Sequence, residues 1–159
     1  MSESAGYSRI QIALHWAVAL LIGVNYFVSD GIERTFDAMI EGGVVTGWTL
    51  FIHVYFGVAV LVLVLARLVV RLVQGSPAAA ATTPHLLNRL GAVSHWALYA
   101  LMVLVPALGA ISWFGGVDAT PGLHVQAMNV LLVLVHAGAA LLHQFVLRDG
   151  LLMRMVRGQ

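Results

Sequence analysis

The sequence predicts an all-α integral membrane protein, built as a bundle of four membrane-spanning helices. The 159 residues are 60% hydrophobic and only 9% charged, with a mean hydropathy of +0.92, whereas ordinary soluble domains are about 25% charged. Four apolar runs are each close to or above the roughly 20 residues that a helix needs to cross a bilayer. These runs cover residues 10–28, 48–70, 90–114 and 123–147. The rest of the chain is too short for a separate soluble domain, so we expect residues 1–159 to form a single transmembrane domain.

The first run, residues 10–28, is expected to stay in the protein as a helix rather than to be removed as a signal peptide. No cleavage-site pattern precedes it, and His15 and Asn25 interrupt its apolar character. Ser8 stands just before the run, where a serine suits the N-cap of a helix.

The second and third runs carry further polar residues within apolar sequence. His53 lies near the beginning of the second run, which ends in Arg67 and Arg71. The third run contains His95 and Pro106, and a membrane helix tolerates a proline if neighbouring groups satisfy the carbonyl that it frees.

The arginines indicate how the helices are oriented. Only Arg34 lies in the acidic connection of residues 29–47, between the first and second runs. The other seven fall on the side of both termini and of the connection between the second and third runs: Arg9, Arg67, Arg71, Arg89, Arg148, Arg154 and Arg157. Because positive residues accumulate on the cytoplasmic side, we expect both termini to be cytoplasmic.

The chain contains no cysteine. Its absence excludes disulfides, thiolate catalysis, cysteine-bound iron–sulfur clusters and covalent haem attachment through a C-x-x-C-H motif. The net charge of +1 says little by itself, whereas the distribution of the charged residues along the chain indicates the orientation of the helices.

Histidines stand inside the apolar runs, where ionisable side chains are by default functional. At a rise of about 1.5 Å per residue, His15 and His136 fall at one depth near the cytoplasmic side, and His53 and His124 at another near the outer side. Two neutral imidazoles per iron give a low-spin electron-transfer centre. We therefore expect haem b held by His15 with His136 and by His53 with His124, forming an electron path across the bilayer.

Other polar residues leave alternatives open. His143 could contact a haem propionate, hydrogen-bond a quinone or be an ordinary interfacial histidine, and a structural role for His95 is as well supported as a functional one. His85 is expected in or beside a solvated loop. Arg67 and Arg71 are first of all positive-inside residues, with propionate contact as the alternative. A zinc site is not expected, because no carboxylate or cysteine completes a tetrahedral ligand set near the histidines.

Four stretches resemble the bacterial cytochrome b561 family: YSRIQIALHW (residues 7–16), HVYFGVAVLVLVLARLVVR (53–71), SHWALYALMVLVPALG (94–109) and VHAGAALLHQFVLRDGLLMRM (135–155). The resemblance covers most of the chain and fails mainly in the two outer connections. It implies a four-helix, di-haem b protein of the bacterial inner membrane that exchanges electrons with quinone, with superoxide oxidase as the activity of one member type. The matching positions imply His15 and His136 for the cytoplasmic-side haem and His53 for the outer haem.

The chain departs from the family pattern at the second ligand of the outer haem. The family places the two ligands of the last helix fourteen residues apart, nearly on one face. Gly122 stands fourteen residues before His136, whereas His124 stands twelve before it, about 120° round an ideal helix. His124 could still serve if the helix entry at Pro121 and Gly122 is offset, or if a π-bulge lies between His124 and His136. Otherwise the outer haem has one protein ligand or is absent.

The expected function is that of a haem b oxidoreductase that transfers electrons from a periplasmic-side one-electron donor to ubiquinone. Superoxide and a basic periplasmic redox protein are the candidate donors, and the acidic outer connections favour the protein. The quinone site is expected near His143, Arg9 and Gln11, because a quinone needs a hydrogen-bond donor and a proton source. The alternatives are a haem-binding anchor subunit that relays electrons from a partner enzyme, and a non-redox scaffold. The expected partners are the lipid bilayer and quinone, and not nucleic acid.

Overall fold

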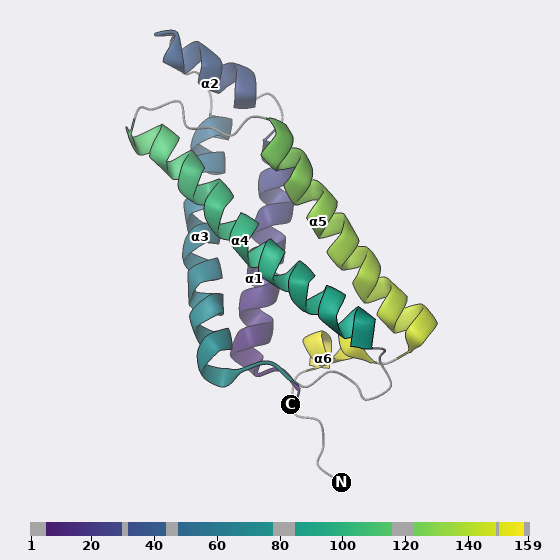
Figure 1. Ribbon diagram of the computed structural model, residues 1–159. Helices are drawn as coiled ribbons and strands as arrows, with labels where there is room; N and C mark the ends of the chain where they lie inside the picture. The colour runs from purple at the N-terminus through teal and green to yellow at the C-terminus, as the bar shows by residue number, and fades with distance from the viewer. Residues whose placement is uncertain are drawn as a thin grey trace.

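The protein is a bundle of long helices with a short helix at each end (Figure 1). The computed structural model describes residues 6–29, 32–43, 48–77, 85–115, 123–148 and 150–157. Its helices are α1 (Arg9–Val28), α2 (Ile32–Ile40), α3 (Trp48–Gln74), α4 (His85–Gly115), α5 (Leu123–Leu142), the π-helical turn η1 (His143–Leu147) and α6 (Leu151–Arg157). The described residues contain no strand. The predicted all-α membrane bundle is confirmed, and α1, α3, α4 and α5 with η1 correspond to the four apolar runs.

The surface of the bundle is apolar, as a lipid environment requires. α1, α3 and α4 are long and apolar enough to cross a membrane. Large apolar side chains on these helices remain exposed, with Phe27 and Trp48 each 82% exposed and Val73 80% exposed. In water, contiguous apolar surface of this kind marks an interaction site, and here the partner is lipid.

A small core holds α1, α3 and α4 together. Val18 of α1, Val60 and Val64 of α3 and Tyr99 of α4 are buried and form one cluster. α3 packs against both α1 and α4, whereas α5 packs against α4. The three helices of the core therefore position the inward-facing polar groups of the bundle, and α5 closes one side (Figure 1).

Hydrogen bonds tie the beginning of α1 to the end of α3. Ser8 caps α1 as expected: its side chain accepts from the backbone N–H of Gln11, and its backbone N–H donates to the Gln11 side chain. The Ser8 hydroxyl donates to Gln74 at 2.7 Å, and the Gln11 amide donates to the carbonyl of Gly75 at 2.9 Å. Gly75 has φ +76°, a left-handed conformation that ends a helix readily at a glycine. These bonds fix the beginning of α1 against the end of α3 at one end of the bundle.

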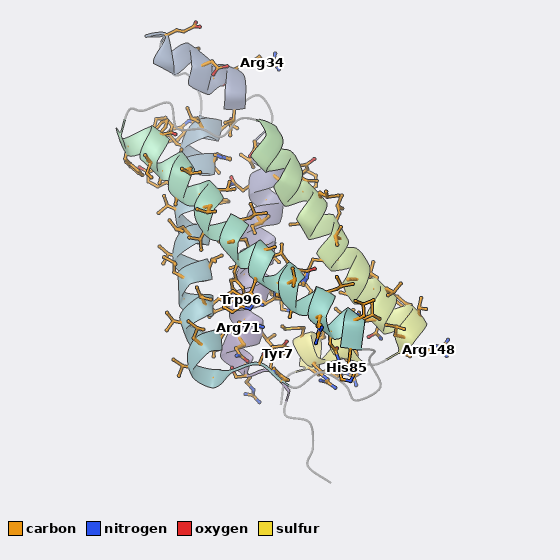
Figure 2. All side chains as sticks on the ribbon, in the orientation of Figure 1. Tyr7, Arg34, Arg71, His85, Trp96 and Arg148 are labelled. Carbon is orange, nitrogen blue, oxygen red and sulfur yellow. The ribbon has the colours of Figure 1, made fainter. Side chains whose placement is uncertain are left out.

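The charged residues divide between the two ends as the sequence indicates. Figure 2 shows Arg71 and Arg148 toward one end of the bundle and Arg34 on α2 at the other. α6 joins the arginine-rich end, where the indole N–H of Trp16 donates to the carbonyl of Met155 at 2.9 Å.

Two helices lie outside the four predicted runs. α2 falls within the connection that was expected to be a loop, although Ile32, Phe36, Met39 and Ile40 recur with helical spacing. α6 follows η1 after a sharp turn, in which Arg148 has φ 53° and Gly150 has φ 72°. Both helices are much shorter than a membrane-spanning segment, so the length of the apolar runs did not predict them. α4 also begins earlier than predicted, at His85, which is exposed.

Candidate functional site

Three imidazoles from three helices meet in the half of the bundle near α6. His15 comes from α1, His95 from α4 and His136 from α5, and all three are partly buried. The ring centres of His15 and His136 are 6.3 Å apart with their planes at 70°. The ring centres of His95 and His136 are 5.2 Å apart with their planes at 81°. His136 is therefore the ring that both other histidines approach.

Only one of the two ring-centre distances suits a shared haem iron. Two imidazoles that would bind one iron from opposite sides, each through an iron–nitrogen bond of about 2 Å, have ring centres roughly 6 Å apart. The 6.3 Å between His15 and His136 matches this requirement, and the 5.2 Å between His95 and His136 is too short for it. His15 and His136 thus fit a bis-imidazole iron centre.

The backbone around this pair also leaves space. α1 packs closely on α3 and α5 packs on α4, whereas α1 and α5 do not pack closely on one another within the described residues. A planar macrocycle between opposed imidazoles needs open space of this kind.

His95 has a defined tautomer. Its Nδ1 lies 2.6 Å from the carbonyl oxygen of Gly91, one turn earlier in α4. Because a carbonyl only accepts, Nδ1 must carry the hydrogen, and Nε2 then presents a lone pair. The sequence left the role of His95 open, and its position on α4, close to His136, shows that it belongs to the same cluster.

His53 is oriented at the other end of the bundle by the last residues of α1. Its Nδ1 lies 2.7 Å from Oγ of Ser29, and the Ser29 hydroxyl donates to the backbone carbonyl of Asn25. Since the single hydroxyl hydrogen of Ser29 goes to Asn25, the hydrogen between Ser29 and His53 must come from Nδ1. Nε2 of His53 is then free to bind a metal, with its other nitrogen held as in most metal-binding histidines.

The predicted partner of His53 is described only in its backbone. His124 belongs to α5, and nothing is described of its side chain. α5 is α-helical throughout Leu123–Leu142, and the π-helical turn begins only at His143. No π-bulge therefore separates His124 from His136, and their angular offset of about 120° remains. Pro121 and Gly122, where the alternative offset was expected, lie outside the described residues.

The three residues predicted for quinone lie near the arginine-rich end. Arg9 is the exposed first residue of α1, and His143 is the partly buried first residue of η1. Gln11 is only 7% exposed: its amide oxygen accepts from the backbone N–H of Ser8 in the cap of α1, and its amide N–H donates to the carbonyl of Gly75 after α3. Next to His143, the buried Oε1 of Gln144 has no hydrogen-bond partner among the residues that the structure describes.

An open pocket lies beside Gln144. It is lined by Gln144, Phe145, Arg148 and Gly150, all in or just after η1. This pocket could not be predicted from the sequence, because it depends on the π-helical turn and on the left-handed conformation of Arg148.

Comparison with known proteins identifies the family. Residues 6–158 match the sequence model of prokaryotic cytochrome b561. The chain belongs to the prokaryotic cytochrome b561 family. It is 45% identical over 159 residues to cytochrome b562 of Cereibacter sphaeroides, with 99% of each chain covered.

The chain also matches two less similar relatives over nearly their whole length. The chain is 29% identical to the probable superoxide oxidase CybB of Yersinia pestis, with 94% of this chain and 95% of that protein covered. It is 25% identical to cytochrome b561 homolog 1 of Escherichia coli, with 94% and 96% covered. Family membership makes the protein a bacterial membrane haem b protein, with electron transfer as the function that this implies. The resemblance stated from the sequence is thereby confirmed.

Proposed function

We propose that this cytochrome b561 family member is a di-haem oxidoreductase of the bacterial inner membrane, folded as one domain over residues 1–159 with both termini cytoplasmic. It transfers electrons from a one-electron donor on the periplasmic side to ubiquinone. The observation that carries the proposal is the pair His15 and His136, whose ring centres lie 6.3 Å apart. A six-coordinate iron between two imidazoles transfers electrons without offering an open site for oxygen.

Two haems at two depths give the electron path. His15 and His136 hold the inner haem, at the arginine-rich end. His53 holds the outer haem with His124 as its partner. The hydrogen bond from Nδ1 of His53 to Ser29 supports His53 as a ligand, because it leaves Nε2 with a lone pair.

The charge of the outer end supports a protein donor over superoxide. α2 carries Arg34 as the single basic residue of an acidic connection. A negative surface repels the superoxide anion and attracts a basic redox protein. Superoxide is kept as the second candidate donor, because the Yersinia pestis relative is named a probable superoxide oxidase.

Ubiquinone accepts the electrons at the inner haem, near His143, Arg9 and Gln11. An imidazole can donate a hydrogen bond to a quinone carbonyl and deliver a proton. The pocket beside η1 supports this end of the bundle as the quinone site. Because Gln11 already holds Gly75, its part in that site is the positioning of α1.

A haem-binding anchor subunit, which would receive electrons from a partner enzyme, is the alternative. Purified protein in detergent distinguishes the two. A pyridine haemochrome assay that gives two haems per chain, a bis-histidine spectrum, and ubiquinone reduction driven by a soluble one-electron donor without a partner would support the oxidoreductase. Reduced haems that do not pass electrons to ubiquinone would contradict it and favour the anchor.

A further inference from the structure

We propose that Arg67, Arg71 and Tyr99 form an anion-binding site that takes the propionate carboxylates of the inner haem. The site rests on the proposed placement of a haem between His15 and His136. It is a separate claim about residues on α3 and α4, neither of which supplies a ligand to that iron.

Two guanidinium groups from α3 surround one buried ring of α4. Arg67 and Arg71 are one helical turn apart and so share a face of α3. The guanidinium carbon of Arg67 lies 5.9 Å from the centre of the Tyr99 ring, and that of Arg71 lies 5.8 Å from it. Nε of Arg67 also donates to the Tyr99 hydroxyl at 3.0 Å. The two side chains are thus held in place by a shared aromatic partner.

This arrangement differs from that of ordinary positive-inside arginines, which extend toward the lipid head groups. Tyr99 is only 5% exposed and belongs to the core cluster with Val18, Val60 and Val64. Arginines that contact this ring are directed toward the interior of the bundle. Both are themselves partly buried.

The positive charge has no carboxylate partner within the described residues. No ion pair of Arg67 or Arg71 is found there. Charges in a membrane interior are costly unless they are paired. The site therefore calls for negative charge from a ligand.

Tyr99 adds a hydrogen-bond donor. Its hydroxyl oxygen accepts from Arg67, which leaves the hydroxyl hydrogen to be donated. No acceptor for that hydrogen is found within the described residues. Two guanidinium groups and one phenol together present donors only, as an anion requires.

The position of the site, near the histidine cluster, favours a haem propionate as the anion. Tyr99, which both arginines contact, lies one helical turn after His95 on α4, and the ring centre of His95 is 5.2 Å from that of His136. A haem held by His15 and His136 would bring two carboxylates into this half of the bundle. Arginine binds carboxylate in a bidentate manner, and two arginines match two carboxylates. A lipid phosphate has similar chemistry and is the other source of an anion.

Resonance Raman spectra of the holoprotein test the contact directly, because the propionate bending mode shifts when a propionate loses its hydrogen-bond donors. Arg67→Gln and Arg71→Gln should each shift this mode while the bis-histidine bands stay in place. Arg67→Lys, which keeps the charge, should give a smaller shift than Arg67→Gln. The matched control is Arg89→Gln, which replaces an exposed arginine in the first turns of α4 and should leave the mode unchanged.

Tyr99→Phe provides a second route if the arginine variants fail to fold, because it removes one hydrogen bond and keeps both charges. A propionate mode that stays unchanged in Tyr99→Phe and in every haem-loaded arginine variant would overturn the proposal. Loss of a co-purified anionic phospholipid in the arginine variants, with that mode unchanged, would assign the site to lipid instead. A parent protein without a bis-histidine spectrum would refute the proposed haem placement, whereas an unshifted mode with that spectrum intact refutes only the anion site.

Discussion

The imidazole rings of His15 and His136 lie 6.3 Å apart with their planes at 70°, although they belong to the first and the last of the long helices. α1 and α5 otherwise make little backbone contact within the described residues. The two rings are therefore brought together by α3 and α4, which hold the outer helices in place. A metal between the rings would link α1 to α5 directly.

Replacement of either ring should remove the inner haem. His15→Ala and His136→Ala each delete one of two axial ligands, so we expect each to lower the haem content from two per chain to one. The pyridine haemochrome assay measures this loss, and His85→Ala, at an exposed position, serves as the control. Unchanged haem content in both variants would show that the pair does not bind iron.

His95→Ala should keep the inner haem. The separation of 5.2 Å between His95 and His136 is shorter than two imidazoles on one iron require. We expect full haem content, with a shift of the midpoint potential of the inner haem, because a polar ring beside His136 is lost. Redox titration followed in the visible bands measures the shift. If His95→Ala loses a haem and His15→Ala does not, the iron lies between His95 and His136.

The sequence predicted the helices better than it predicted the contacts among them. Membrane-length runs follow from composition, and equal depth along straight helices is enough to bring His15 near His136. The contacts of His95 with His136 and of Arg67 with Tyr99 depend also on how each helix is rotated about its axis. That rotation is set by packing between helices and not by hydropathy, so the sequence left these contacts open.

Ser29→Ala should weaken the outer haem without removing a ligand. Ser29 accepts the Nδ1 hydrogen of His53 and so fixes which nitrogen faces the metal. Loss of such an outer partner typically weakens metal binding by roughly 10- to 100-fold. We also expect a higher midpoint potential for that haem, because His53 becomes a less basic ligand and the ferric state is stabilised less.

Redox titration and haem retention on a gel-filtration column measure the two effects. Ser76→Ala, an exposed serine that follows α3, is the matched control. Identical potentials in Ser29→Ala and in the parent would mean that Ser29 only ends α1 and does not act on the haem.

His143→Ala should slow electron transfer to quinone and leave the haem spectra intact. The residue begins η1, seven positions after His136 and next to the pocket lined by Gln144 and Phe145. Loss of one hydrogen bond to a quinone that gains charge corresponds to a rate decrease of roughly 10- to 100-fold. Stopped-flow oxidation of the reduced protein by a soluble ubiquinone analogue measures the rate. Equal rates in variant and parent would place the quinone elsewhere.

His124→Ala tests the outer haem where the sequence and the helix geometry disagree. His124 stands twelve residues before His136, and the intervening helix is α-helical, so the two positions lie about 120° apart around the axis of α5. The outer haem nevertheless needs a partner for His53, and the other histidines of the long helices lie at the opposite end or beside His136. If His124 is that partner, its ring must bind on a different side of α5 from the ring of His136. His124→Ala should then lower the haem content from two to one and leave the His15–His136 signal in the low-temperature EPR spectrum. A parent protein with one haem, or a variant that keeps two, would show that His124 is not a ligand and that the electron path does not pass through it.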